Sequence, residues 1–420
     1  MRLELAIHPV TDIDLTSETK LLGAALHVDP QELQRLILED QRLQSVDIET
    51  ARPGEACRIG VVFDILEPRA KERGSGSDFP GILGPYAVAG QGTTHVLRGV
   101  AVTVLDEGSP PSGGKLLEMS GPAAAASPFG SLLHLVVAPH AVPGLERHTV
   151  LNALRGVSVT VATHLAQAAL GQPPAATEVL ELPGPTQSSR EGLPRVAYIG
   201  QIQSRQRVAE VNEQILYGSN TVGMVPLPLH PNEWLDGALV CAYMNMGMET
   251  YLYQNHPVIT ELYRRHQAGE INFVGTIATV AASDGEDRSR NCMLAAHLAK
   301  WNLGANVVVL TKFGGGAPHS DMAETARLCE AAGMATAVAV TDMSGDRRAE
   351  SALLFNYPEI NAIVYNGGND TRWKATPVDR IIAGSPEAAK ALAALQEITA
   401  GNVCGVTNQQ GASRLRSVVY

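Results

Sequence analysis

The sequence lacks the features that would point to nucleic acid, to a membrane or to an oxidising compartment. Lysine and arginine number 32 against 43 aspartates and glutamates, and the net charge of -11 argues against a nucleic-acid or acidic-membrane surface. The five cysteines form no CxxC pair, so neither a disulfide framework nor a structural zinc site is expected. No apolar run reaches about 18 residues, and the N-terminus has no signal-peptide pattern. We therefore expect a cytoplasmic protein whose partner is a small molecule or another protein.

The length and composition are those of a globular protein with more than one domain. At 420 residues, 45% of them hydrophobic, the chain exceeds what a single core usually spans. The segment from Gly171 to Pro194 is dense in proline, glycine and serine, as linkers are. We place a domain boundary there, with a first domain over residues 1–185 and a second over residues 186–420.

The first domain is predicted to be a β-rich α/β unit. Strands are predicted for three β-branched apolar runs, at 58–66, 94–105 and 132–138. Asp29 and Pro30 form a helix-start signal, and an apolar face at helical spacing predicts a second helix from His148 to Leu170.

After residue 195 the pattern changes to alternating strands and helices. Nearly continuous apolar runs, typical of strands covered on both faces, lie at 195–200, 221–229, 271–282, 306–311, 335–341 and 361–365. Helices are predicted over 287–302 and 320–332, the second capped by Ser320 or Asp321. This repeat predicts a doubly wound, mostly parallel, Rossmann-like sheet, and an α/β class for the whole chain.

Ligands of such sheets bind beyond the carboxyl ends of the strands. One loop there holds a glycine run before a predicted helix, which is suited to binding a carboxylate through backbone N–H groups: Gly314, Gly315 and Gly316. A second polar loop contains Asn366, Gly367, Gly368 and Asn369. His319 is either an acid–base group, a metal ligand or a surface histidine beside a helix cap. The sequence has no P-loop or dinucleotide fingerprint, so no nucleotide cofactor is expected.

The stretch from His230 to Pro257 contains the candidate nucleophile. Prolines at both ends favour extended or turn backbone, and Cys241 lies between them. The methionines near Cys241 are explained by core packing. A polar and aromatic group follows at Tyr253, Gln254, Asn255 and His256.

Motifs along practically the whole chain, in collinear order, carry a family resemblance. They are MRLEL at the N-terminus, the ARPGE and EPR turns, FPG, GxTHVLxG, MSGP, HPNEWLDGA, YQNHPV with ITELYRRH, INFVGTIAT, and ITAGNVCGVTNQ. This set resembles the proprotein component of protein B of glycine, sarcosine and betaine reductases, and more distantly the D-proline reductase proprotein.

The resemblance implies a cytoplasmic subunit of an oligomeric complex that reductively cleaves a carbon–nitrogen bond of a small amine or amino acid. Its partner would be a cysteine- or selenocysteine-containing subunit. Members of the family are expected to cleave themselves before an internal cysteine, which becomes a pyruvoyl group. This chain departs from the pattern, because the family cysteines lie further beyond Asp-Gly-Ala, where Met244 and Met246 stand here, and Cys241 follows Val240.

Two hypotheses remain open. In the first, Cys241 is the pyruvoyl precursor or a thiol nucleophile, Asp236 and Asn245 shape its turn, and His319 moves protons. The residues that would orient the substrate are Tyr253, Gln254, Asn255 and His256. In the second, the chain is an uncleaved binding or scaffold subunit, and the partner carries all the redox chemistry. A free-standing dehydrogenase is disfavoured by the missing dinucleotide fingerprint.

Overall fold

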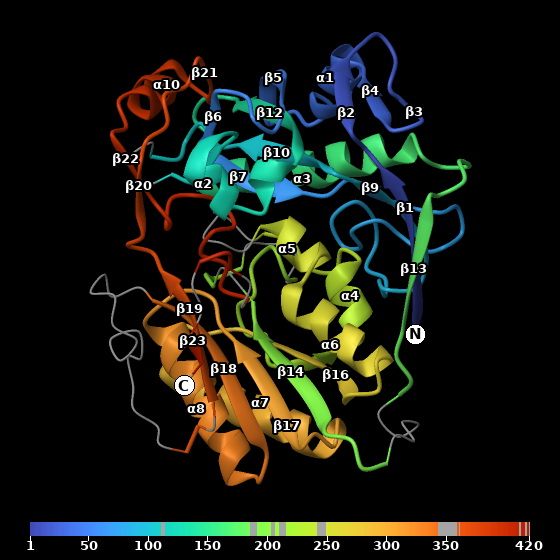
Figure 1. The fold of residues 1–420 in the computed structure, drawn as a ribbon, viewed down its shortest axis with the longest axis vertical. Coiled ribbons are helices and arrows are strands. Elements are labelled where there is room, and N and C mark those ends of the chain that lie inside the picture. Colours follow the sequence, from blue (N-terminus) through green and yellow to red (C-terminus); the bar gives the residue numbers. More distant parts are fainter. Residues whose placement is uncertain are drawn as a thin grey trace.

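The computed structural model describes residues 1–110, 114–184, 191–202, 206–209, 216–241, 249–342, 359–360, 362–410, 413–415 and 418–419. The fold is mixed α/β and contains several sheets with parallel strand pairs. Figure 1 shows the N-terminal sheets in the upper half, a large parallel sheet in the lower half, and helices α4 (Pro231–Leu235) and α5 (Thr250–Gln254) between them.

The N-terminal residues form two four-stranded sheets and a small three-stranded one. The first contains β13 (Ala176–Glu181), β1 (Arg2–Pro9), β9 (Gly92–Arg98) and β8 (Arg69–Lys71). The second contains β5 (Leu43–Ala51), β12 (Leu133–Ala141), β10 (Val100–Leu105) and β7 (Val62–Leu66). The third contains β2 (Asp12–Leu15), β4 (Ala25–Val28) and β3 (Lys20–Leu22). Helices α1 (Pro30–Ile37) and α3 (Arg147–Gln167) contribute to the same core.

The predicted helices of this part are confirmed, whereas two predicted strands are each divided. At Gly99, between β9 and β10, φ is 104° and an added Cβ would lie 2.4 Å from the carbonyl oxygen of Val10. At Val61, between β6 (Cys57–Gly60) and β7, φ is 55°. Positive φ interrupts the extended backbone at both places, so each apolar run supplies strands to different partners.

The lower sheet has seven strands in the order β15-β16-β14-β17-β18-β19-β23. Their bounds are β15 (Leu227–Leu229), β16 (Asn272–Thr279), β14 (Arg195–Gln201), β17 (Val307–Thr311), β18 (Ala335–Asp342), β19 (Ala362–Gly368) and β23 (Val418–Val419). The strands from β16 to β19 pair in parallel, and β15 and β23 are antiparallel at the two edges. The carboxyl ends of the parallel strands therefore lie along one edge of the sheet.

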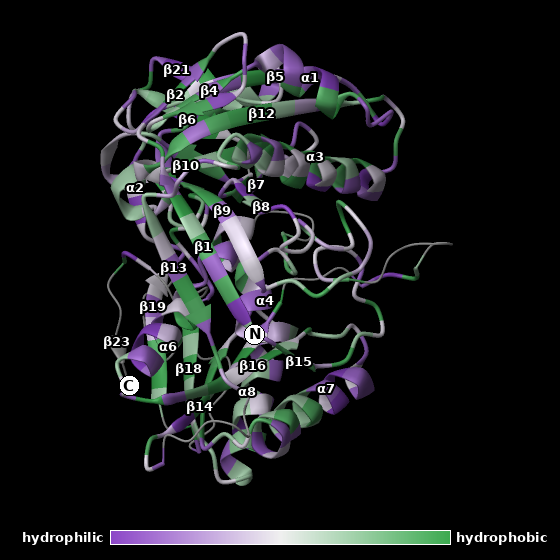
Figure 2. Ribbon diagram, turned by 90° about the vertical axis from the view of Figure 1, so that its right-hand side faces the viewer, coloured by the Kyte–Doolittle hydropathy of each residue, from purple (hydrophilic) through white to green (hydrophobic). Residues whose placement is uncertain are grey.

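Helices cover both faces of this sheet. Val196 and Tyr198 of β14 pack with α4 and α6 (Pro257–Gln267), whereas Ala197 and Ile199 face α7 (Gly285–His297) and α8 (Ala317–Ala331). A π-helical turn (Leu298–Asn302) follows α7. Figure 2 shows mostly hydrophobic strands in this sheet and hydrophilic residues on α7. Alternating side chains buried on both faces explain why these strands read as continuous apolar runs.

The C-terminal segment returns to the N-terminal sheets. Strand β21 (Arg380–Ile382) pairs in parallel with β6, whose other neighbour is β11 (Leu116–Glu118). The buried guanidinium of Arg58 in β6 donates to the carbonyl oxygen of Leu392 at 2.6 Å and to Glu118 at 2.5 Å. The remaining elements here are β20 (Arg372–Lys374), β22 (Glu397–Thr399), α10 (Pro386–Ala393), α2 (Gly121–Ala126) and a 3-10 turn (Phe129–Ser131).

The α/β class is confirmed, and two details of the sequence prediction are wrong. Of the strand predicted over 221–229, only Leu227–Leu229 is extended. Helix α8 begins at Ala317 with Gly316 as its N-cap, not at Ser320 or Asp321, because Gly316 has φ of 63° and Pro318 fits the first turn. The Rossmann-like assignment and the boundary near residue 185 stay predictions. Among the helices of the described residues, none is both long and apolar enough to cross a membrane.

Candidate functional site

Cys241 is fully buried, and the elements around it hold its peptide unit through polar contacts. Its backbone N–H donates to the hydroxyl of Thr250 in α5 at 2.8 Å, and its carbonyl accepts from Arg155 Nε in α3 at 3.4 Å. Its Sγ donates to the carbonyl oxygen of Phe63 in β7 over 3.8 Å. Asn245, predicted to shape the same turn, lies outside the described residues.

A buried carboxyl group stands behind Thr250. Asp64 Oδ1 accepts the backbone N–H of Thr250 at 2.8 Å, and Asp64 Oδ2 accepts its hydroxyl at 2.5 Å. Burial raises the pKa of Asp64 to about 7, against the opposing effect of the hydrogen bonds from Thr250. A carboxyl group with a pKa near neutrality can hold or release a proton at physiological pH. Asp64 and Thr250 therefore form a hydrogen-bonded chain that ends at the backbone nitrogen of Cys241.

The predicted group at residues 253–256 fastens α5 to the N-terminal sheets. Gln254 uses both ends of its amide on the backbone of Glu67, at 2.9 and 3.0 Å. Asn255 accepts from Arg69 at 3.2 Å and donates to the Glu67 carboxylate at 3.3 Å. Tyr253 is fully buried. These contacts give the side chains fixed positions at the junction of the two halves.

Asp236 has three hydrogen-bond partners in the N-terminal part of the chain. Its carboxylate pairs with Lys71 Nζ and accepts from Gly90 N and Thr94 Oγ1, both at 2.8 Å. The adjoining cavity has a volume of about 10 Å³, which is about the space of one water molecule. The arrangement makes Asp236 a buried joint between α4 and the N-terminal sheets.

His256 connects this junction to the parallel sheet. Its Nε2 lies 3.0 Å from the hydroxyl of Tyr198, which lies 2.6 Å from Thr311 Oγ1 at the end of β17. Burial lowers the pKa of His256 to about 3 and raises that of Tyr198. The hydrogen-bonded side chains of His256, Tyr198 and Thr311 are therefore uncharged at physiological pH. They fix the position of His256 relative to β17 without an ion pair.

The carboxyl end of β17 leads into the predicted glycine loop. Lys312 is 1% exposed, and its Nζ donates to Gly314 O at 2.5 Å and to Gln409 Oε1 at 3.2 Å. The same Gln409 oxygen accepts from Gly314 N at 3.0 Å. Burial lowers the pKa of Lys312 to about 8. Burial, and then the Lys312 charge, lower the pKa of His319 to about 4, so the histidine is neutral at pH 7.

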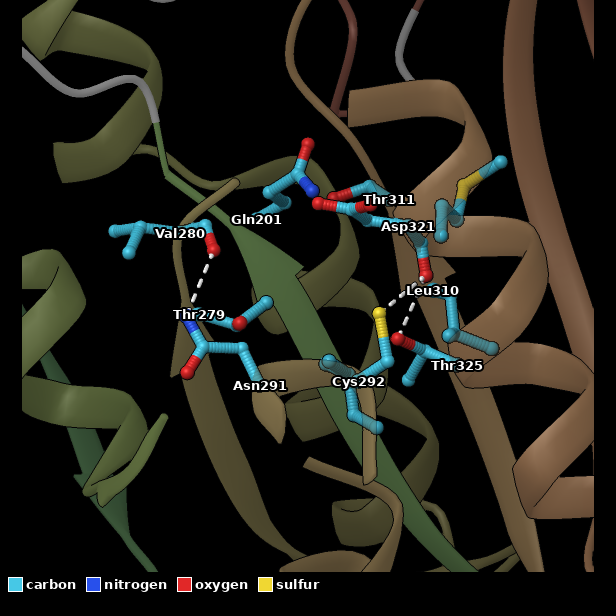
Figure 3. A pocket seen from close by; sticks show the side chains of 11 residues that line it. Gln201, Thr279, Val280, Asn291, Cys292, Leu310, Thr311, Asp321 and Thr325 are labelled. Carbon is cyan, nitrogen blue, oxygen red and sulfur yellow. Dashed lines mark hydrogen bonds between the residues drawn. The ribbon is translucent and has the colours of Figure 1, made fainter. Parts of the chain in front are cut away.

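Figure 3 shows a small pocket at the same edge of the sheet, between β14, β17, α7 and α8. Gln201 and Thr311 line it together with Cys292, whose Sγ donates to the carbonyl oxygen of Asp321 over 3.4 Å. Its volume is about 10 Å³, so it holds no more than a water molecule.

A larger cavity, of about 240 Å³, lies where α5 meets the C-terminal loop. Asn255 contributes to its wall from the predicted group, and Asn408 and Arg414 from the end of the chain. A volume of this size accommodates a small amine or amino acid.

The second predicted loop lies apart from the first. Asn366, Gly367 and Gly368 end β19, and Asn369 follows in a turn. Strand β18 separates β19 from β17. Among the described residues, no hydrogen bond joins this loop to Cys241 or to the Gly314 loop. The described residues also contain no group of three or more histidine, cysteine or acidic side chains arranged to hold a metal ion.

The polar contacts around Cys241 fit a pyruvoyl group formed there by chain cleavage. A leaving peptide nitrogen needs a proton, and the Thr250 hydroxyl backed by Asp64 lies 2.8 Å from it. Arg155 and Thr250 would hold the carbonyl group and the neighbouring backbone.

Sequence reasoning missed Asp64, Thr250, Lys312 and Gln409. Asp64 lies inside an apolar strand run, and its partner Thr250 is remote in sequence. Lys312 gave a weak signal, because it directly precedes the glycine run at the end of an apolar strand.

Comparison with known proteins covers the whole chain. Residues 1–411 match the family model of glycine/sarcosine/betaine reductase component B subunits. The chain is 30% identical to glycine reductase complex component B subunits alpha and beta of Peptoclostridium acidaminophilum, with 100% of both chains covered. It is 31% identical to the sarcosine reductase complex component B subunit alpha of the same organism, over 91% of this chain and 89% of the relative.

The betaine reductase complex component B subunit alpha of that organism is 28% identical, with 92% of this chain and 89% of the relative covered. No solved structure matches the chain significantly. The match over the whole chain confirms the family membership that the collinear motifs predicted: the chain belongs to the family of glycine/sarcosine/betaine reductase component B subunits.

Proposed function

We propose that this chain is the substrate-binding subunit of a reductase complex that cleaves a carbon–nitrogen bond of a small amine or amino acid. The observation that carries the proposal is the match over 100% of both chains to a glycine reductase component B protein. The cavity of about 240 Å³ beside Asn255 supports a small substrate.

The chemistry is divided between this chain and a cysteine- or selenocysteine-containing partner. The partner's thiolate or selenolate bonds to the substrate α carbon while the carbon–nitrogen bond breaks, and the amine leaves with the electron pair. A pyruvoyl group, where one is formed, supplies a carbonyl that acts as an electron sink for the amine. This chain binds and orients the substrate, and its buried junction keeps the position fixed.

Cys241 is the proposed cleavage point. Attack of Sγ on the Val240 carbonyl carbon forms a thioester and breaks the amide bond, and the freed nitrogen takes a proton through Thr250 from Asp64. β-Elimination at residue 241 then breaks the Cβ–Sγ bond, and Val240 leaves as a thiocarboxylate. Water adds to the imine form of the dehydroalanine that remains, and ammonia leaves, which gives the ketoacyl carbonyl. The name of the glycine reductase relative gives two subunits, alpha and beta, for one chain, which is what a single cleavage of that chain would produce.

Intact-protein mass tests the cleavage directly. The wild-type protein is expected to give two fragments divided before Cys241, the second with a blocked N-terminus, and Cys241→Ala is expected to give one uncut chain. Asp64→Asn keeps the shape of the buried group and should slow cleavage. One uncut mass in an active wild-type complex would eliminate the pyruvoyl group.

A second function, an uncleaved substrate-binding subunit, is favoured by the complete burial of Cys241. Amine release from glycine, sarcosine and betaine, measured with the co-purified partner, separates the possibilities. Release with an uncut chain supports this second function. No release from any of the three compounds, with a cut chain and the partner bound, would overturn the proposed substrate class.

A further inference from the structure

Lys312 is a buried lysine that has no acidic partner among the described residues. Its Nζ has two neutral acceptors, the carbonyl oxygen of Gly314 and the amide oxygen of Gln409, so a third N–H remains. None of the ion pairs formed by the described residues includes Lys312. Buried charges in proteins are normally paired, because an isolated one loses its hydration without compensation. The uncompensated charge therefore indicates a position that an anion completes.

The start of α8 adds positive potential at the same place. This helix has 15 residues, its N-cap Gly316 provides no side-chain hydrogen bond, and its first turn contains no acidic residue. A helix N-terminus attracts negative charge through its N–H groups and dipole. Gly314, which binds both Lys312 and Gln409, connects the lysine to this helix start.

Access and the neighbouring groups favour a small anion. Gly316 and Ala317 are exposed, so the helix start itself faces solvent, two residues beyond the Gly314 carbonyl that accepts from the buried Lys312. The facing histidine, His319, is neutral at pH 7 and supplies no negative charge. A carboxylate has two oxygens, which can accept the third Lys312 N–H and a backbone N–H together.

We propose that Lys312, with the Gly314 loop and the N-terminus of α8, binds the carboxylate of a small ligand. That this ligand is the substrate of the reductase complex rests on the proposed function above; the anion site itself does not. The new element of the assignment is the residue, Lys312, that would contact the carboxylate.

Binding to the isolated full-length chain tests the site without the partner. Acetate, glycine and betaine are the carboxylate probes, and methylammonium chloride at the same ionic strength is the control. The carboxylates are expected to raise the thermal midpoint of the wild type, and methylammonium is not. Lys312→Met and Lys312→Gln should weaken carboxylate binding by about 10–100-fold, the loss expected for one charge-assisted hydrogen bond.

Two further variants locate the effect. Lys71→Met removes another buried lysine and should leave the carboxylate response intact. Arg414→Met removes a cation at the wall of the larger cavity. If Arg414→Met abolishes the response while the Lys312 variants keep it, the assignment is overturned.

A measurement on the wild type covers the case in which the Lys312 variants do not fold. Saturating betaine should slow hydrogen exchange of the backbone N–H groups in the Gly314 loop and the first turn of α8, as mapped by peptide mass. Equal exchange with and without betaine would overturn the site. Carboxylate binding with no amine release in the complex would instead count against the proposed function alone.

Discussion

Lys71 and Lys312 are both buried lysines, and they differ in what surrounds the ammonium group. Lys71 Nζ donates to the carbonyl oxygen of Gln91 at 2.8 Å and pairs with the carboxylate of Asp236. Lys312 Nζ also has two acceptors, but both are neutral. Lys71 lies at the joint between α4 and the N-terminal sheets, whereas Lys312 lies at the carboxyl edge of the parallel sheet.

This difference distinguishes a lysine that stabilises the fold, Lys71, from a lysine that we propose to bind a ligand, Lys312. Where the fold uses a buried lysine to hold two elements together, it also provides the counter-ion, because the unpaired alternative is costly. At the sheet edge the counter-ion is missing from the described residues, at the place where sheets of this kind bind ligands. The pair of lysines therefore offers matched variants with opposite expectations.

The largest expected effect is the difference in the free energy of unfolding between a variant that lacks Lys71 and one that lacks Lys312. Lys71→Met leaves the Asp236 carboxylate buried without its cationic partner and should lower the free energy of unfolding by about 3–5 kcal/mol. Lys312→Met removes an uncompensated charge and should leave stability unchanged or raise it. Urea unfolding of both variants measures the contrast. Equal destabilisation by the two substitutions would mean that Lys312 is also a structural charge.

The pH dependence of stability gives the next effect. Burial lowers the pKa of Lys312 to about 8 from its ordinary 10.5, so the unfolded chain binds this proton more tightly than the folded one. The contribution of Lys312 to stability is present above pH 10.5 and is lost as the pH falls through about 8, a difference on the order of 3 kcal/mol. Unfolding curves of the wild type and Lys312→Met should converge at high pH. Parallel curves across this window contradict the expectation.

Gln409→Glu should make the surroundings of Lys312 resemble those of Lys71. The new carboxylate replaces the amide oxygen that lies 3.2 Å from Nζ. Stability should increase by about 1–3 kcal/mol, and the response to added acetate should disappear because the anion site is filled from within. Thermal midpoints with and without acetate measure both effects. Gln409→Leu, which supplies no charge, is the control and should be less stable than the wild type.

The smallest effect is expected from the uncharged hydrogen-bonded series formed by the side chains of His256, Tyr198 and Thr311. Tyr198→Phe removes the hydroxyl that lies between His256 and Thr311. The loss should be about 1 kcal/mol, since no charge is left buried. Urea unfolding measures it, and acetate binding at Lys312 should be unchanged. A loss as large as that of Lys71→Met would mean that this series, too, carries charge.

The sequence predicted the strands of the parallel sheet well and the strand pairing of the N-terminal sheets poorly. Runs such as 195–200 and 306–311 became β14 and β17, because strands buried on both faces leave a continuous apolar signal. The division at Gly99 depends on the close approach of Val10, and the pairing of β21 with β6 depends on tertiary packing. Neither leaves a local pattern in the chain.

The candidate site was predicted in part. The structure joins His256 to the end of β17 through Tyr198 and places Gly314 beside Lys312, whereas the predicted loop at Asn366 lies apart from both. Lysines in polar loops are usually solvated, so burial of Lys312 could not be read from its neighbours. The roles assigned to Cys241 and His319 stay predictions.

The pairing of β21 with β6 has a consequence for a chain cut before Cys241. The first fragment would keep β6 and Arg58, and the second would keep β21 and Leu392. Backbone hydrogen bonds of one sheet would then run from one polypeptide to the other, supported by the buried guanidinium. Nicked protein would migrate as a single species in the native state and come apart only in denaturant. The same pairing means that the sheet containing β6 is complete only after β21, which is synthesised much later, has been added.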